Sequence, residues 1–149
     1  MAKILYVDQN PKDYSAEHRF EYYELQRFIL NGLKKNYDAR LVHDLHSREV
    51  DIALRDNYDI LLTHFPFKKI NFDSSSSGTV VYGYEPAMQR LESIIKNDKK
   101  LKVIVYTGAL PEVVSDKMLL SIGVLRILRK TEDVAKDLKK IEKYLDNIL

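Results

Sequence analysis

The chain has 149 residues, 45% of them hydrophobic and 31% charged, as in an ordinary globular protein with one core. It has no cysteine, which excludes disulfides, thiolate chemistry and zinc sites built on sulfur. The net charge is +2, and the lysines of the C-terminal third alternate with acids, so nucleic-acid binding is not expected. No apolar run reaches the length of a membrane span, and the opening residues MAKILYVDQN have no signal-peptide pattern. We therefore expect a cytoplasmic protein with no membrane segment.

Strand and helix patterns alternate along the whole chain. In chain order, the sequence predicts strand 2–7, helix 21–36, strand 39–45, helix 48–57, strand 59–64, helix 86–97, strand 101–108, helix 111–122, strand 124–128 and helix 132–147. Strict alternation of this kind predicts a single α/β domain over residues 1–149 with a parallel sheet. Right-handed crossovers place helices on both faces, as a three-layer sandwich. The common strand order of such doubly wound, flavodoxin-like folds is 2-1-3-4-5.

Several side chains support the predicted helix boundaries. Pro111 is expected to begin helix 111–122, while Ser47 and Thr131 are expected to cap helices 48–57 and 132–147. Helix 21–36 is expected to bury one face made of Leu25, Phe28, Ile29 and Leu33. In the last helix an apolar stripe lies opposite a charged face and consists of Val134, Leu138, Ile141, Leu145 and Ile148.

Two connections, at 9–20 and 65–84, are longer than βα units need, so we interpret them as inserted loops. The second contains four consecutive serines, 74–77, followed by Gly78. It lacks the Gly-Lys-Ser/Thr ending of a phosphate-binding P-loop. Its aromatic and apolar residues suit a lid over the sheet, a docking surface for a protein, or a loop packed on its own domain.

Ligands of open parallel sheets bind beyond the carboxyl ends of the strands, next to the switch point in strand order. In the predicted order that point lies between the first and third strands. The polar side chains at the strand ends are Asp8, Gln9, His64, Thr107 and Lys130. They are the candidate functional residues.

At these positions the sequence resembles the receiver domain of bacterial two-component response regulators. The likeness is carried by KILYVDQ, NYDILLTH, KVIVYTGA and SIGVLRILRKT, in the family's order, and fails over residues 10–20 and 65–84. The resemblance implies a site where a phosphoryl group passes from a histidine kinase to an aspartate. Such a site supplies Mg²⁺, a lysine and a hydroxyl to spread the developing negative charge.

Carried over residue by residue, the resemblance indicates a degenerate phospho-acceptor pocket. The family's paired acids fall on Asp8 and Gln9, so only the first is kept. Its phospho-accepting aspartate falls on His64. Its hydroxyl residue falls on Thr107, with the small residue Gly108 next to it.

The fifth strand carries the remaining parts of the likeness. The family's lysine falls on Lys130, followed by Thr131 where a proline is usual, and its aromatic switch residue falls on Ile127. The family's contact face corresponds to helix 111–122, strand 124–128 and helix 132–147, with Arg126 and Arg129 near it. A protein partner or a homodimer is expected at this face.

One carboxylate is a poor Mg²⁺ site, because the ion prefers several hard oxygen ligands. The resemblance therefore implies a phosphorylation-independent pseudo-receiver that acts as a signalling or protein-interaction module. We expect no enzymatic activity, no catalytic residue and no cofactor; Mg²⁺ is possible but not expected. Lys130 is expected to form a partly buried ion pair with Asp8.

Two alternatives stay open. The chain could be an atypical receiver that responds to a phosphoryl group or an ion through Asp8 or His64, or a binder of a nucleotide or flavin at the strand ends. For His64 itself, the interpretations are a hydrogen bond to Asp8 or a cap from the loop, an ion contact, and phosphorylation of the imidazole.

Overall fold

The computed structural model describes residues 1–66 and 83–149, which fold around one five-stranded parallel sheet. The strands are β1 Lys3–Asp8, β2 Asp38–His43, β3 Ile60–Thr63, β4 Lys102–Thr107 and β5 Arg126–Arg129. The helices are α1 Arg19–Lys34, α2 Arg48–Ala53, α3 Tyr84–Asn97, α4 Asp116–Ser121 and α5 Val134–Ile148, and a 3₁₀ turn, η1, spans Pro11–Asp13. The strand order is β2-β1-β3-β4-β5. The predicted fold class and order are confirmed.

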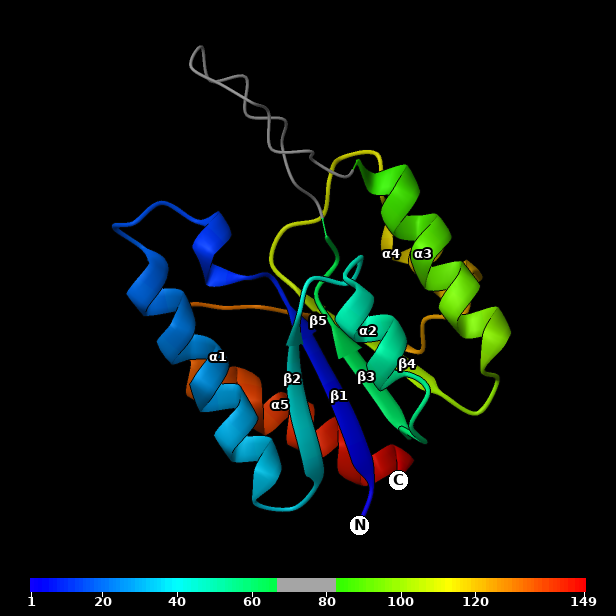
Figure 1. Ribbon diagram of the computed structural model, residues 1–149, viewed down its shortest axis with the longest axis horizontal. Coiled ribbons are helices and arrows are strands. Elements are labelled where there is room, and N and C mark those ends of the chain that lie inside the picture. The colour runs from blue at the N-terminus through cyan, green and yellow to red at the C-terminus, as the bar shows by residue number, and fades with distance from the viewer. Residues whose placement is uncertain (67–82) are drawn as a thin grey trace.

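The sheet separates two apolar layers, with α1 and α5 on one face and α2, α3 and α4 on the other (Figure 1). Successive side chains of a strand point to opposite faces. Tyr6 of β1 therefore packs in the α1/α5 layer, while its neighbour Val7 packs in the other layer. β3 is buried along its whole length, as its continuous apolar run predicts.

The two helices of the α1/α5 layer approach closely at Gly32. A Cβ atom added there would overlap the side chain of Leu138 on α5, with Cδ1 at 2.8 Å. Only a residue without a side chain leaves room for this contact. A larger residue at position 32 would therefore require the Leu138 side chain to shift.

Helix α4 begins later than predicted. Pro111 does not start it; the Ser115 hydroxyl caps it by accepting a hydrogen bond from the Met118 N–H. The residues before Ser115 form a turn closed by a bond from Val114 N to Pro111 O. A serine that can satisfy a free N–H of the first helical turn sets the start of α4, in preference to the proline four residues earlier.

The cap of α5 also differs from the prediction. Asp133, and not Thr131, is the capping residue, because its carboxylate accepts the Lys136 N–H. The Thr131 hydroxyl instead donates to the buried carboxylate of Asp137. Ser47 does stand at the N-cap position of α2, but its side chain makes no capping bond.

On α1 the predicted inward position of Phe28 is wrong. Phe28 is 43% exposed, while Gln26 is 4% exposed and lies on the inner face with Ile29 and Leu33. The reason is that Gln26 makes hydrogen bonds beneath the strand ends, which offset the cost of burying its amide.

The other observed strand and helix boundaries differ from the predicted ones by a few residues. Strand β2 ends at His43 because Asp44 has a φ of 68°, outside the extended region. The long 9–20 connection contains η1 and passes into α1 at Arg19. Most of the 65–84 connection, residues 67–82, lies outside the described residues, and the interpretations of it given above remain predictions.

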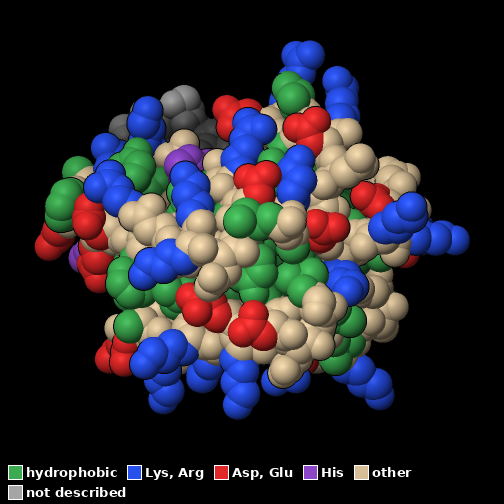
Figure 2. Space-filling view, turned by 90° about the horizontal axis from the view of Figure 1, so that it is seen from below, with side chains coloured by type: hydrophobic (Ala, Val, Ile, Leu, Met, Phe, Trp, Pro, Cys, Tyr) green, Lys and Arg blue, Asp and Glu red, His purple; other side chains and the backbone are tan. Residues whose placement is uncertain are grey.

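The end of the molecule away from the strand carboxyl ends has a mixed surface. Figure 2 shows hydrophobic side chains in its centre, with Lys and Arg interspersed among Asp and Glu around them. Both termini lie at this end (Figure 1). In the part of the chain that the structure describes, no helix is long and apolar enough to cross a membrane.

Candidate functional site

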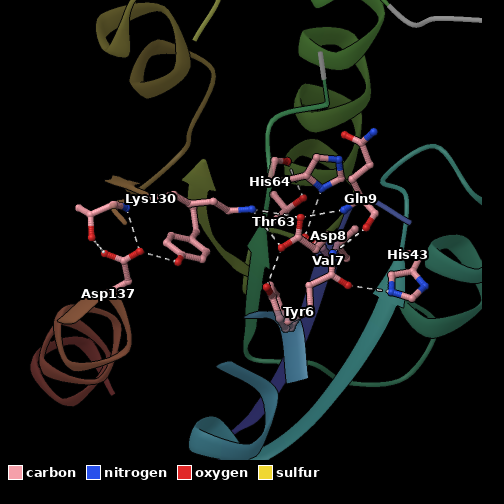
Figure 3. A network of polar contacts seen from close by, with 12 residues as sticks. Tyr6, Val7, Asp8, Gln9, His43, Thr63, His64, Lys130 and Asp137 are labelled. Carbon is pink, nitrogen blue, oxygen red and sulfur yellow. Dashed lines mark hydrogen bonds and ion pairs between the residues drawn. The ribbon is translucent and has the colours of Figure 1, made fainter. Parts of the chain in front are cut away.

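Asp8, the last residue of β1, is the centre of a buried polar network (Figure 3). Its side chain is 4% exposed. One carboxylate oxygen, Oδ2, accepts a hydrogen bond from the Tyr6 hydroxyl at 2.6 Å, and Oδ1 accepts one from the Gln9 N–H at 2.8 Å. The Lys130 ammonium lies 3.2 Å from Oδ1 and 3.1 Å from Oδ2. The predicted ion pair between Lys130 and Asp8 is therefore present.

These partners determine the charge of Asp8. Burial raises the pKa of the carboxyl, since it disfavours the charged form. The Lys130 ammonium, the nearby His64 ring and the bonds from Tyr6 and Gln9 lower the pKa by more, so that it lies below its ordinary value. Asp8 is thus an ionised carboxylate at neutral pH, with its charge compensated inside the protein.

His64 follows the last residue of β3 and is 5% exposed. Its Nδ1 lies 3.3 Å from the carbonyl oxygen of Val7, and its Nε2 is buried without a hydrogen-bond partner among the described residues. The carbonyl can only accept, so Nδ1 carries the proton and Nε2 has a free lone pair. The hydrogen bond that we considered between His64 and Asp8 is not formed; the ring bonds to the Val7 carbonyl instead.

Burial lowers the pKa of His64, and the Lys130 ammonium lowers it further, while the carboxylate of Asp8 acts in the opposite direction. The net pKa lies below the ordinary value, and the imidazole is neutral at pH 7. A neutral histidine therefore occupies the end of the central strand.

The other strand-end residues do not all join this network. The amide of Gln9 points away from the Asp8 carboxylate in Figure 3, so only the backbone of Gln9 contacts Asp8. Thr107 is buried, and its carbonyl accepts the Lys130 N–H at 2.8 Å. Within residues 1–66 and 83–149, the Thr107 hydroxyl takes no part in the hydrogen bonds around Asp8. A Cβ added to Gly108 would meet no atom of the described residues within 4 Å, so none of these neighbours requires a glycine there.

Sequence reasoning missed a second buried carboxylate, Asp137 of α5, which is 2% exposed. It accepts hydrogen bonds from the Tyr106 hydroxyl at 2.8 Å and from the backbone and hydroxyl of Thr131. The Lys130 ammonium lies 5.1 Å from the centroid of the Tyr106 ring, a cation–π contact that joins the two carboxylate clusters. The signal was available, because Asp137 falls on the dry stripe of its helix between Val134 and Ile141.

Gln26 of α1 was also not identified from the sequence, and it supports the backbone next to Asp8. Its amide nitrogen donates to the Gln9 carbonyl at 2.7 Å, and its amide oxygen lies 3.0 Å from Nε2 of His43. His43 is paired in register with Asp8 across β1 and β2. Burial lowers the pKa of His43, although the nearby Asp8 acts in the opposite direction. The Gln26 amide thereby fixes the backbone that follows Asp8.

A small cavity of about 60 Å³ lies between the sheet, α1 and α5 beside Asp8. Its polar lining includes Tyr6, Gln26, Tyr106 and Lys130. This volume suits a few waters and is far below the ~300–1,000 Å³ of pockets that hold drug-sized ligands. This cavity is thus too small for a nucleotide or a flavin.

The donor set around Asp8 does not fit Mg²⁺. Both carboxylate oxygens already accept hydrogen bonds, and the neighbouring cation Lys130 opposes a second positive charge. Among the described residues there is no group of three or more His, Cys, Asp and Glu side chains placed to hold a metal ion.

The predicted contact face is formed by α4, β5 and α5. Arg129 is already engaged, since its guanidinium forms an ion pair with Asp116 of α4 and donates to the Gly108 carbonyl. Arg126 lies over the ring of Tyr144, 5.3 Å from its centroid, while Ile127 is partly buried on the opposite face of the sheet. Exposed apolar side chains of this region are Val113, Met118, Leu120 and Leu125.

No family model matches the chain, and no curated protein matches it. Solved structures do match the chain. A receiver domain protein from Methanospirillum hungatei aligns with a TM-score of 0.60 and 18% identity over 99% of this chain and 95% of that one. An orphan response regulator of H. pylori gives 0.59 and 17% over 97% and 96%, and a response regulator from Thermotoga maritima gives 0.58 and 13% over 98% and 99%. The chain therefore has the fold of response regulator receiver domains.

Proposed function

We propose that this chain is a receiver-type signalling module that acts by docking to a protein partner or to a second copy, without taking up a phosphoryl group. The observation that carries the proposal is the state of Asp8. Its two oxygens are occupied by Tyr6, Gln9 and Lys130. A receiver needs this carboxylate for a metal ion and this lysine for the phosphoryl group, and here each neutralises the other.

The acceptor position supports the same proposal. The resemblance places His64 where an aspartate would be phosphorylated, and His64 is buried and held against the Val7 carbonyl. It offers no carboxylate to form an acyl phosphate and no oxygen to a metal ion. Ile127 replaces the aromatic switch residue, which agrees with the loss of a phosphorylation-driven movement.

An amide NMR titration of the free protein tests the proposal. Mg²⁺ is added to millimolar concentration, followed by beryllofluoride as a phosphoryl mimic. We expect the amides of Asp8, His64, Thr107 and Lys130 to stay unshifted. A saturable shift of these four together would overturn phosphorylation independence.

Intact mass after incubation with a small phosphodonor gives a second readout. No gain of a phosphoryl mass is expected in the wild-type chain. An Asp8→Asn variant serves as the matched control, since it removes the carboxylate at the centre of the site. A gain in the wild type that is absent from this variant would assign phosphorylation to Asp8.

One observation favours a second candidate, phosphorylation or ion contact at His64. Its Nε2 has a free lone pair and no hydrogen-bond partner among the described residues, and the Lys130 ammonium is near enough to influence its charge. A phosphoryl mass that survives Asp8→Asn but disappears in His64→Gln would support this candidate over the first. Phosphohistidine is also acid-labile, so loss of that mass on mild acid treatment is the confirming result.

A further inference from the structure

Strand β5 is an edge of the sheet, and a groove of about 550 Å³ lies beside it, between the strand and α5. An edge strand leaves a row of backbone N–H and C=O groups without strand partners on its outer side. The groove is lined by Arg126, Ile127, Leu128, Arg129, Lys140, Lys143, Tyr144 and Asn147. It therefore combines free backbone groups with the side chains of one face of a helix.

The charge of this groove has one sign. Four of the eight lining residues are Lys or Arg, and none is Asp or Glu. Arg129 is paired with Asp116, but no ion pair within the described part of the chain involves Arg126, Lys140 or Lys143. Three uncompensated cations around one groove favour an anionic occupant.

A contact with Tyr144 and the spacing of residues on α5 place these cations along the groove. Arg126 lies at the start of β5 with its guanidinium over the Tyr144 ring, so its orientation is restricted by a contact inside the protein. Lys140, Lys143 and Asn147 follow one another along α5 at spacings of three and four, which places them on one side of the helix. The positive charge thus follows the length of the groove.

We propose that the groove between β5 and α5 binds an extended, acidic segment of a partner protein, which adds to the sheet as a strand beside β5. The backbone of the segment supplies hydrogen bonds to β5, and its acidic side chains pair with Arg126, Lys140 and Lys143. The side chains of the segment that point away from α5 contact Ile127, which is partly buried on the face of the sheet opposite to Leu128. This inference rests on the proposed function only in that the chain acts by docking.

The test uses an isotope-labelled protein and a synthetic probe, a peptide in which glutamate alternates with valine. Binding is followed by amide NMR shifts and by hydrogen exchange. We expect shifts in β5 and along the 140–147 face of α5, and slower exchange at the outward-facing amides of β5. A peptide in which lysine replaces each glutamate is expected not to bind.

Two variants with the same loss of charge separate a site from general attraction. Arg126→Ala/Lys143→Ala removes two lining cations, and it should weaken binding of the acidic peptide about tenfold, a loss typical of two partly exposed ion pairs. Lys136→Ala/Lys139→Ala removes two cations from the same helix outside the groove, and the affinity should stay within about twofold. Thermal unfolding of both variants confirms that they fold.

The proposal is overturned if the peptide does not bind, if the two variants lose affinity equally, or if the shifts lie outside β5 and α5. Shifts without slower exchange in β5 would overturn strand addition. A single-stranded oligonucleotide that binds the groove more tightly than the peptide would identify a general polyanion site and also overturn it. Uptake of a phosphoryl group contradicts the proposed function but leaves the peptide result unaffected, so the two failures are distinguishable.

Discussion

Replacement of Lys130 by methionine is the sharpest test of how the strand ends are held. Methionine keeps most of the apolar stem of lysine and removes only the ammonium that contacts Asp8. The Asp8 carboxylate would then stay buried with two donors, the Tyr6 hydroxyl and the Gln9 N–H. We expect Lys130→Met to lower the free energy of unfolding and to raise the pKa of Asp8.

The magnitude follows from the geometry. At 3.1 Å and an effective dielectric constant of about 20, the attraction of the two charges is roughly 5 kcal/mol. The lysine side chain keeps 32% of its exposure, so the desolvation of the ammonium is partial and water screens part of this attraction. Removal of one member of a fully buried pair costs about 3–5 kcal/mol, and we therefore expect about 2–3 kcal/mol here.

Urea unfolding at pH 7 measures the loss of unfolding free energy. Lys139→Met is the control, because Lys139 is an exposed lysine of α5 that has no part in the site. The control should change the free energy of unfolding by less than about 0.5 kcal/mol. The double variant Asp8→Asn/Lys130→Met should be less destabilised than the sum of the single variants, since it leaves no unpaired charge. A loss below about 0.5 kcal/mol for Lys130→Met would refute the reasoning.

Three further outcomes are expected. The pKa of His64 in the folded protein is lowered. The stability that the neutral His64 contributes is therefore present above the unfolded pKa of about 6.5 and is lost as the pH falls toward the folded pKa. His64→Gln should flatten the pH dependence of the unfolding free energy between pH 7 and 5 by up to about 1.4 kcal/mol per pH unit. Gly32→Ala should destabilise the fold by about 1 kcal/mol in thermal unfolding, because the overlap with Leu138 outweighs the gain in helix propensity. Ser115→Ala should cost about 1 kcal/mol through loss of the cap on the Met118 N–H, and faster exchange of that amide should report it.

Each of these has a result that would contradict it. For His64, a pH dependence as steep in His64→Gln as in the wild type would assign the effect elsewhere. For Gly32, the double variant with Leu138→Ala should show no additional loss beyond that of Leu138→Ala alone. For Ser115, Ser115→Asp should retain the cap, and a loss equal to that of alanine would argue against the capping bond.

Most of the fold could be predicted from the sequence because its signals are local. Alternation of short apolar runs with amphipathic segments specifies the sequence of elements, and the handedness of crossovers restricts the topology to few choices. The stripe from Val134 to Ile148 and the apolar run 60–62 of β3 are of this kind. The predicted ends of the elements were less accurate, because the sequence offers two capping candidates for each helix. Ser115 caps α4 where Pro111 was expected to begin the helix, and Asp133 caps α5 where Thr131 was expected.

The site could be predicted only in part, because its contacts join residues far apart in the sequence. Lys130 and Asp8 were matched through the likeness to receivers, and their ion pair is present. The supporting groups were not found. Tyr6 lies two residues before Asp8 on the same face of β1, and Asp137 lies within an apolar stripe, so both could be inferred from periodicity. Gln26 could not, since its role depends on which helix packs beneath β1.

The buried phenols have a consequence at the alkaline end of the pH scale. Burial, followed by the contact with Asp8, raises the pKa of Tyr6 well above its ordinary value, and burial together with the bond to Asp137 does the same for Tyr106. A raised folded pKa contributes stability below the unfolded value of about 10, and this contribution is lost as the pH rises beyond it. The chain has ten tyrosines and no tryptophan, so ultraviolet absorbance follows its phenolates directly. Tyr6 and Tyr106 should therefore lose their protons only when base unfolds the chain, in one abrupt step of the titration curve.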